Sequence, residues 1–463
     1  GFTPRPYQEH CINGGDPRRG IGIMPAFARY KRVLAVLATG CHRRGQLVLR
    51  NDGTPIAVED VKPLDLLLGP DGTPRVVLSL TRGKAPMYEV RPVKGAPFVV
   101  DRDHILTLAK VNTGKPSFVP GLVDVSVGEW LNWNPTQKWT HKLVRASAIE
   151  FDRAPTEFII PPYILGVLIG DGSLRSGVVV SKPDVEIHEA IRDFARSIGL
   201  TTSMDIQPNR CPAIRIIGSG GPRSNPVLEE LGRLGLRVLS CERRIPDAYK
   251  YGSIQQRREL LAGLLDTDGH LSSNTYDYIT GSPGLAEDVA FVVRSLGLAG
   301  YISPCEKRSQ HGTGGTYYRM CITGELDGLP LRIPRKRAGP RGRARSVLRT
   351  GFDIIPTGTV EPFYGFTLDG DHRYLLGDFT ISHNCGKTEL YLAIARRFIE
   401  SSKTPTDKRV LILAHRDELV SQPIERSPRF GLALAREQGR ESGVGRIERV
   451  VASTIQSMSK RLA

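Results

Sequence analysis

Two stretches of this sequence, far apart along the chain, match the two halves of a single strand-loop-helix pattern. Residues 31–40, "KRVLAVLATG", are rich in Leu and β-branched residues and end in a turn, which predicts a buried strand. From Cys385, "CGKTELYLAIARRF" supplies the Lys-Thr pair of a phosphate-binding loop and then an amphipathic helix. Any fold of this chain must therefore account for residues 41–384, which separate the two halves.

The joined loop, "ATGCGKT", resembles motif I of superfamily 2 helicases. "RPYQEHCI" from Arg5 is similar to their base-recognition segment, and residues 409–422 and 449–462 are similar to motifs Ia and Ib. The resemblance implies an α/β domain that binds ATP and Mg²⁺ and acts on double-stranded DNA. It is an incomplete motor here, because the acidic Mg²⁺-holding motif and the second helicase domain do not follow. The nucleotide-binding residues that the resemblance implies are Gln8, Gly40, Gly386, Lys387 and Thr388.

The interrupting segment has characteristic ends: it begins at Cys41, ends at His383-Asn384 and is followed by Cys385. These ends resemble the boundaries of an intein, a segment that excises itself from a precursor. Residues 41–77, 97–108 and 361–384 resemble the conserved splicing blocks of that family, with short strands separated by Asp-Gly turns. The resemblance implies an all-β splicing domain of the Hint type, which needs no cofactor.

The implied chemistry uses a thiol, imidazoles and a side-chain amide. Cys41 attacks the carbonyl of Gly40 and forms a thioester, because a thiol is a strong nucleophile next to the peptide to be broken. His104 donates a proton to the departing nitrogen or polarises the bond. Cys385 then takes over the thioester, and cyclisation of Asn384 releases the insert. His372 and His383 are the candidates for proton transfer and oxyanion stabilisation in that last step.

Two positions depart from the splicing blocks. Asp101 stands where Thr is usual, and an ionised Asp accepts hydrogen bonds but cannot donate them, which predicts a slower or differently controlled first step. Gly365 stands where an assisting Asp is frequent, and Asp369 and Asp371 are the possible substitutes.

Two similar segments within the insert, "ILGVLIGDG" (164–172) and "LAGLLDTDG" (261–269), resemble the motif of LAGLIDADG homing endonucleases. Small residues four apart allow two helices to approach closely along one face. Each helix then ends at an acid, Asp171 or Asp268, where the helix dipole and mutual repulsion are unfavourable. Mg²⁺ bound between these carboxylates, activating water for phosphodiester hydrolysis, would explain the arrangement. The alternative is two ordinary amphipathic helices with Asp-Gly caps.

Basic residues give the chain a net charge of +16, which favours double-stranded DNA as a partner over an inert basic surface. Residues 329–352 carry eight basic residues and no acid, and form either a solvated linker or a phosphate-contacting arm. Arg243 stands where Lys commonly assists cleavage, so cleavage is less assured than the fold. The basic segments 209–218 and 316–324 fit DNA-reading strands and ordinary core strands equally well.

Composition indicates a soluble multidomain protein without a membrane span, which we expect to be a cytoplasmic monomer of a bacterial or phage-infected cell. One alternative is an ordinary ATP-dependent helicase with a long structural insertion. Another is a DNA-binding insertion in which splicing or cleavage has been lost. The predicted parts are host segments 1–40 and 385–463, splicing segments 41–150 and 351–384, an α+β endonuclease domain 151–335, and a basic linker 336–350.

Overall fold

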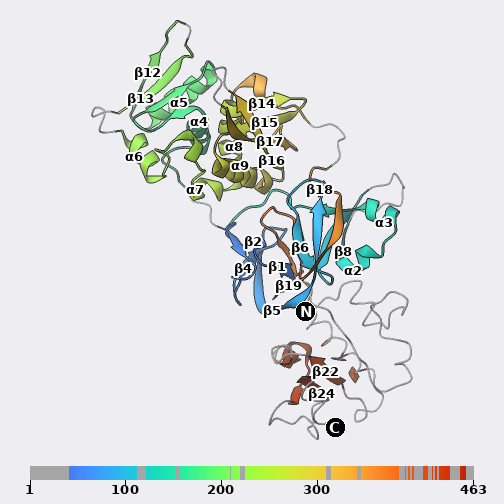
Figure 1. Ribbon diagram of the computed structural model, residues 1–463. Coiled ribbons are helices and arrows are strands. Elements are labelled where there is room, and N and C mark those ends of the chain that lie inside the picture. Colours follow the sequence, from blue (N-terminus) through green and yellow to red (C-terminus); the bar gives the residue numbers. More distant parts are fainter. Residues whose placement is uncertain are drawn as a thin grey trace. The chain divides into compact units, whose positions relative to one another are not determined.

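The computed structural model describes residues 41–111, 121–152, 157–208, 210–218, 225–308, 314–340 and 346–384, together with short stretches between 392 and 454. Contacts divide the chain into two compact units, residues 41–384 and residues 1–40 with 385–463. Figure 1 shows the described elements, coloured along the sequence. No helix of the described residues is both long and apolar enough to cross a membrane.

The ends of the 41–384 unit form two antiparallel sheets. The first has the order β19-β1-β6-β5-β4, and β19 also pairs with β5 along most of its length. The second has the order β18-β9-β7-β21-β20, and β8 pairs with β7. The strands are β1 (His42–Arg43), β4 (Leu66–Leu68), β5 (Pro74–Pro92), β6 (Phe98–Asp101), β7 (Ile105–Lys110), β8 (Leu122–Ser126), β9 (His141–Val144), β18 (Arg349–Thr350), β19 (Phe352–Leu368), β20 (Arg373–Leu375) and β21 (Ile381–His383).

Alternation of buried and exposed residues along these strands produces one core. Val90, Val100 and Leu108 are fully buried, and the side chains of Phe366 and Tyr374 pack in the same cluster. Two short helices and one hairpin complete this part of the molecule. They are α2 (Val127–Leu131), α3 (Pro135–Thr140), β2 (Leu47–Leu49) and β3 (Pro55–Ala57).

The middle of the unit repeats one topology twice: a helix, a two-stranded hairpin, a second helix and two further strands (Figure 1). The four-stranded sheets have the matching orders β10-β11-β13-β12 and β14-β15-β17-β16. The first half contains α4 (Pro162–Asp171), β10 (Gly172–Ser173), β11 (Val178–Ser181), α5 (Val185–Ser197), β12 (Thr201–Asp205), β13 (Ala213–Ile217), α6 (Pro226–Arg233), η3 (Ser240–Glu242) and α7 (Asp247–Lys250). The second contains α8 (Ile254–Asp268), β14 (Gly269–Ser272), β15 (Thr275–Thr280), α9 (Pro283–Ser295), β16 (Ala299–Arg308), β17 (Gly314–Thr323) and η4 (Pro334–Lys336).

Helices α4 and α8 meet along the glycines that the sequence places on one face of each. A Cβ atom on Gly166 would lie 2.3 Å from the carbonyl oxygen of Leu260, and one on Gly263 would lie 2.2 Å from that of Tyr163. Both distances are too short for a real Cβ, so only Gly permits this approach. The predicted close contact between the two helices is confirmed.

The two basic segments prove to be strands with one core face and one exposed face. In β13, Ile214 and Ile216 are buried while Arg215 is exposed. In β17, Met320 and Ile322 are buried while Arg319 is exposed. The buried residues belong to a single hydrophobic cluster that runs through both halves. Each segment therefore contributes to the core and also presents a basic residue on the surface.

The second unit contains a small parallel sheet of order β22-β24-β23, formed by β22 (Val410–Ala414), β23 (Leu434–Glu437) and β24 (Val450–Thr454), with the short helix η5 (Ser427–Phe430). Strands β22 and β24 lie in the segments that resemble motifs Ia and Ib. Parallel strands are typical of α/β domains.

Candidate functional sites

Cys41 lies at the start of the first sheet, and its thiol is buried against Met87 and Phe363. Its backbone N–H, which belongs to the Gly40–Cys41 peptide, donates to Oδ1 of Asp101 at 3.0 Å. The N–H of Asp101 donates in turn to the carbonyl oxygen of Cys41 at 3.1 Å. Asp101 is itself buried. The side chain that departs from the splicing blocks thus contacts the peptide next to the predicted nucleophile as a hydrogen-bond acceptor.

Both ends of residues 41–384 pair with one short segment that contains His104. His42 pairs with Val100 across β1 and β6. At the other end, His383 pairs with Ile105 and Ser382 with Leu106 across β21 and β7. His104 is buried in the turn between β6 and β7. The fold therefore brings the predicted residues of both junctions to the same turn.

A chain of buried side chains crosses this region. Nε2 of His104 lies 3.1 Å from Oγ of Ser382, and that hydroxyl donates to Oη of Tyr374 at 3.3 Å. Oη of Tyr374 lies 2.5 Å from Nε2 of His42, whose ring centroid is 4.5 Å from that of His104. Burial lowers the pKa of His42 to about 3, so the His42 ring is neutral near pH 7.

Around Asn384, the backbone is held by β20 and the turn before it. The N–H of Asn384 donates to the carbonyl oxygen of His372 at 3.0 Å, and Asn384 is buried. His372 has a φ of 62°, a left-handed conformation unusual for a non-glycine residue. Nε2 of the fully buried His383 lies 3.8 Å from Oδ2 of Asp124, and Arg373 donates to the same oxygen at 2.9 Å.

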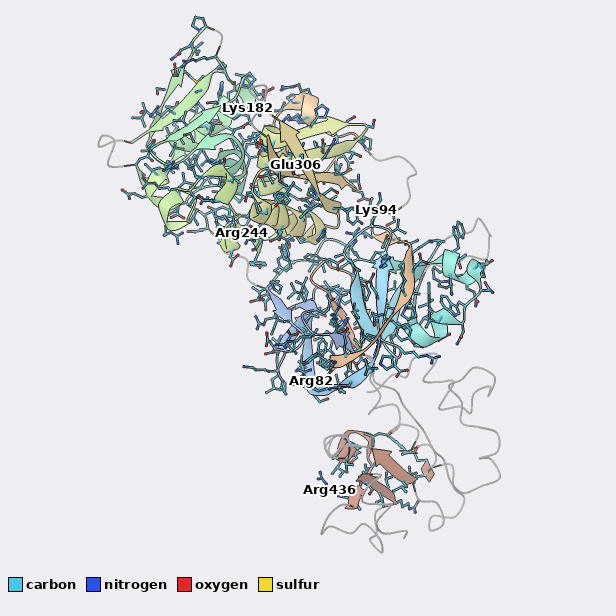
Figure 2. All side chains as sticks on the ribbon, viewed as in Figure 1. Arg82, Lys94, Lys182, Arg244, Glu306 and Arg436 are labelled. Carbon is cyan, nitrogen blue, oxygen red and sulfur yellow. The ribbon has the colours of Figure 1, made fainter. Side chains whose placement is uncertain are left out.

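The two acids considered as substitutes at Gly365 are engaged elsewhere. Oδ1 of Asp369 accepts the N–H of Val76 at 2.8 Å, and Oδ1 of Asp371 accepts Nε of Arg75 at 3.0 Å. At Gly365 itself, the carbonyl oxygen accepts Nη1 of Arg82 at 3.3 Å. Both acids thus have structural partners in the first sheet; Arg82 is labelled in Figure 2.

The acidic residues of the two motifs lie at the ends of the paired helices, because α4 ends at Asp171 and α8 ends at Asp268. Burial and the neighbouring carboxylate of Asp171 raise the pKa of Asp268 to about 6. Nζ of Lys182 lies 2.6 Å from Oδ2 of Asp171 (Lys182 is labelled in Figure 2). Carboxylate oxygens are the ligands that Mg²⁺ prefers, and a cation between these acids would relieve their repulsion, so the pair fits the predicted metal.

Basic side chains cap the same helix ends. Arg243 donates to the carbonyl oxygens of Ile169 at 2.7 Å and Gly172 at 2.5 Å, at the end of α4. Lys336 donates to those of Asp266 at 2.7 Å and Leu265 at 3.1 Å, near the end of α8. Lys336, the first residue of the predicted linker, thus packs against α8.

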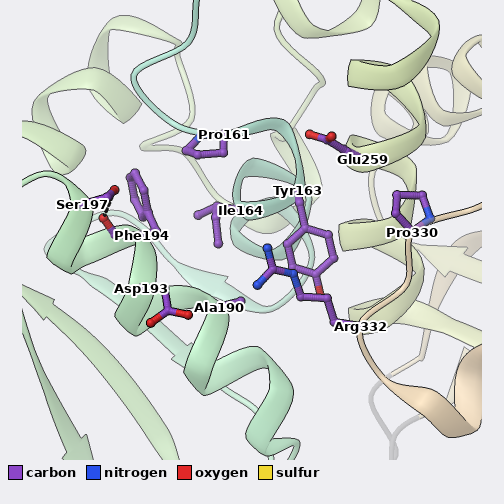
Figure 3. Close-up of a pocket in the computed structure, with 10 residues that line it drawn as sticks. All are labelled: Pro161, Tyr163, Ile164, Ala190, Asp193, Phe194, Ser197, Glu259, Pro330 and Arg332. Atoms are coloured by element: carbon purple, nitrogen blue, oxygen red, sulfur yellow. Dashed lines mark hydrogen bonds between the residues drawn. The ribbon is translucent and has the colours of Figure 1, made fainter.

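Several predicted site residues lie outside the described part of the chain: Gln8, Gly40, Cys385, Gly386, Lys387 and Thr388. A pocket of about 400 Å³ lies beside the beginning of α4, away from Asp171 (Figure 3). Its lining includes Tyr163, Phe194, Glu259 and Arg332. Among the described residues, no cluster of three or more His, Cys, Asp or Glu is suited to hold a metal.

Sequence reasoning did not single out His42, Tyr374, Ser382, Lys182 or Asp124. The first three have no motif spacing, since His42 and Tyr374 are separated by 332 positions along the chain. Strand alternation could not have indicated them either, because neighbouring residues of a strand point to opposite faces, yet Ile381, Ser382 and His383 are all buried.

Comparison with known proteins identifies part of the chain. The family described as "LAGLIDADG-like domain" matches residues 255–326. The chain is 27% identical over 340 residues to the replicative DNA helicase DnaB of Mycobacterium intracellulare, covering 68% of this chain and 53% of the relative. It is 22% identical over 570 residues to the catalytic subunit of the V-type proton ATPase from Candida tropicalis, covering 93% of this chain and 52% of the relative. The chain therefore spans about half the length of these curated relatives.

Further likenesses are more local. The homothallic switching endonuclease of Saccharomyces cerevisiae is 26% identical over 170 residues, covering 32% of this chain and 29% of the relative. The structure of I-DmoI with DNA and Mn is 15% identical with a TM-score of 0.26, covering 36% of this chain and 89% of that one. The gp41-1 intein structure is 14% identical with a TM-score of 0.17, and the match covers 23% of this chain and 70% of that one. The family match shows that residues 255–326, which contain the second of the two repeated motifs, are similar to a LAGLIDADG-like domain.

Proposed function

We propose that this chain is a precursor that excises residues 41–384 by protein splicing and joins Gly40 to Cys385. One observation carries the proposal: the segment around His104 pairs with His42 at one end of the insert and with His383 at the other. Excision and ligation need both junctions at one reactive centre, and this pairing supports that requirement. A purely structural insertion has no need to bury a Cys, four His and an Asn around these two ends.

At the first junction, the thiol of Cys41 attacks the carbonyl carbon of Gly40 and the C–N bond to Cys41 breaks. The leaving nitrogen must gain a proton, and His104 is the proton carrier. The amine that forms becomes positively charged beside the carboxylate of Asp101, which already accepts the N–H of Cys41. That carboxylate favours the thioester product electrostatically.

At the second junction, Cys385 takes the acyl group from Cys41, and the side-chain amide of Asn384 attacks its own carbonyl carbon. The attacking amide nitrogen loses a proton, and His383 carries a proton to the leaving nitrogen of Cys385 as the peptide bond breaks. His372 holds the backbone of Asn384, because its carbonyl oxygen accepts the N–H of Asn384. The amine of Cys385 then attacks the thioester and leaves an ordinary peptide bond.

The inserted domain is proposed to be a site-specific homing endonuclease acting on double-stranded DNA, as a monomer with two similar halves. Asp171 and Asp268 would hold Mg²⁺, which would supply an activated water and stabilise the developing phosphate charge. Lys182 and Lys336 add positive charge at the acid pair. Mg²⁺-dependent cleavage of DNA carrying the joined host-gene sequence, lost in Asp268→Asn, tests this part; salt-dependent binding without cleavage would favour a binding-only insertion.

The host segments are proposed to form part of an ATP-dependent helicase after splicing. In that product Gly40 would meet Cys385, so that Gly386, Lys387 and Thr388 complete the phosphate loop. Similarity to relatives named as a proton ATPase and as a replicative helicase supports a shared insert, because those named activities have little in common. An unspliced helicase with a structural insertion remains the rival.

Mass spectrometry of the expressed chain under reducing conditions separates the two accounts. Splicing yields one piece with the mass of residues 41–384 and one with the mass of 1–40 joined to 385–463. Cys41→Ala blocks the first step and Asn384→Ala blocks release of the insert. Persistence of the intact chain alone would support the structural insertion.

A further inference from the structure

A buried network of hydrogen bonds links the two ends of residues 41–384, and three of its side chains, those of Ser382, Tyr374 and His42, have no role in the steps above. It runs from His104 through Ser382 and Tyr374 to His42, over distances of 3.1, 3.3 and 2.5 Å. None of the four side chains is more than 3% exposed. A closed polar chain at this depth excludes water and restricts each ring to one orientation.

The donor and acceptor of each hydrogen bond in this network follow from how many protons each group can donate. The hydroxyl of Ser382 donates to Tyr374, so its oxygen must accept from His104, whose Nε2 therefore bears a proton. Tyr374 has one proton, and it is directed to Nε2 of the neutral His42. The other nitrogen of His42 then carries that ring's proton. When the His104 ring is neutral, a proton on Nε2 leaves the lone pair on Nδ1.

We propose that Ser382, Tyr374 and His42 are positioning residues that fix His104 in the tautomer protonated at Nε2. The inference rests on the proposed splicing function and extends it. With its lone pair on Nδ1, His104 takes the proton from the thiol of Cys41 as sulfur bonds to the carbonyl carbon of Gly40. As the C–N bond breaks, His104 returns that proton to the nitrogen of Cys41, so the proton moves from sulfur to nitrogen overall.

The same arrangement ties the first step to the second junction. Ser382 belongs to β21 and stands two positions before Asn384, whereas His42 follows Cys41. His104 therefore has its reactive tautomer only while β21 is paired with β7. The first thioester forms only when the C-terminal strand is in place, which suppresses cleavage without ligation.

Histidine-selective ¹⁵N NMR tests the tautomer in a chain that cannot splice. The sample is the full chain with Cys41→Ala, Asn384→Ala and Cys385→Ala, and the His104 signals are identified by their loss in His104→Gln. The expected spectrum has the proton on Nε2, and Ser382→Ala converts it to a tautomer mixture. Tyr88 is a partly buried tyrosine that does not belong to this hydrogen-bond network, so Tyr88→Phe should leave the His104 spectrum unchanged. A proton on Nδ1 in the parent chain would overturn the inference.

A second measurement follows cleavage at the first junction. In an Asn384→Ala chain, thiol-induced cleavage after Gly40 should slow about tenfold or more with Ser382→Ala or Tyr374→Phe, as expected for losing a hydrogen bond that orients a catalytic group. Ser382→Thr keeps the hydroxyl and should restore the rate, and Tyr88→Phe should match the parent. Cleavage as fast as in the parent with Ser382→Ala and with Tyr374→Phe would contradict the proposal. If the parent itself never cleaves or splices, the proposed function fails, whereas the NMR result still decides the tautomer.

Discussion

At the first junction, a single residue, Asp101, is expected to change the rate at which the Gly40–Cys41 peptide bond is broken. Asp101 stands where a hydroxyl is usual, yet its carboxylate accepts the N–H of Cys41 within hydrogen-bonding distance. The sequence predicts a slower first step from the loss of a donor. In the proposed mechanism this carboxylate has a compensating effect, because it would stabilise the ammonium group formed when the bond between Gly40 and Cys41 breaks.

Replacing Asp101 by Ala should slow the first step by about 10- to 100-fold, the cost of losing a hydrogen bond to a charged group. The measurement is thiol-induced cleavage after Gly40 in an Asn384→Ala chain. Asp101→Asn keeps an acceptor oxygen but not the charge, so its cleavage rate should lie between those of the parent and of Asp101→Ala. Equal rates for all three chains would show that the carboxylate has no part in the step.

Asp268 predicts a pH dependence of stability. Its pKa rises from 3.8 to about 6 in the fold because of burial and the carboxylate of Asp171. A raised carboxyl pKa means that ionisation is penalised only in the folded state. The penalty is absent below pH 3.8 and complete above about pH 6, so stability falls as pH rises through this window.

Asp268→Asn removes this penalty and should stabilise the endonuclease domain by about 1–3 kcal/mol at pH 7.5, but not at pH 4. Thermal melting of the full chain in buffer with a chelator measures the effect. Asp327→Asn, at an exposed position, provides the control and should change little at either pH. A variant no more stable than the parent at pH 7.5 would contradict the assigned environment.

Cys41, His383 and Asn384 could be proposed from the sequence, because the proposed chemistry requires such residues at the two ends of the insert. The sequence cannot predict Ser382 or Tyr374 as partners of His104, because a lone Ser or Tyr has no spacing signal. Their roles arise only when β20, β21 and β7 pair.

At the scale of elements, α4 and α8 are the best-predicted feature, because a repeated pattern of small residues carries direct steric information. Arg243 shows what the pattern leaves out. Lys at this position commonly assists cleavage, so Arg there makes cleavage less assured; in the structure its guanidinium donates to carbonyl oxygens at the end of α4, those of Ile169 and of the C-cap residue Gly172. Such a cap depends on how the loop before α7 folds back, and residue order does not encode that path.

Gly263→Ala should destabilise the helix pair, because the added Cβ would lie 2.2 Å from the carbonyl oxygen of Tyr163 and 2.9 Å from the nitrogen of Val167. Overpacking of this kind lowers the melting temperature by roughly 2–12 °C for a domain of this size. Gly232→Ala, near the end of α6, is the matched control. There the nearest neighbour of the Cβ is 3.4 Å away, and helix propensity favours Ala. Equal melting temperatures for the two variants would refute the steric argument.

At the scale of the molecule, the splicing and endonuclease parts of residues 41–384 share a hydrophobic cluster. Leu49, Phe379 and Ile381 come from the splicing part, while Tyr251 comes from the endonuclease. Arg257 is fully buried beside it and donates to the carbonyl oxygen of Ile149. Two domains were predictable from two sets of motifs, but a common core was not, because apolar residues in separate motifs do not reveal which of them meet.

The ligated junction tests the central claim most directly. Trypsin digestion of the expressed chain, followed by tandem mass spectrometry, should yield the peptide "VLAVLATGCGK", in which residues 33–40 are joined to 385–387. The peptide should disappear in Cys41→Ala and in Asn384→Ala chains. Its absence from the parent chain, with peptides spanning Gly40–Cys41 and Asn384–Cys385 both intact, would contradict splicing.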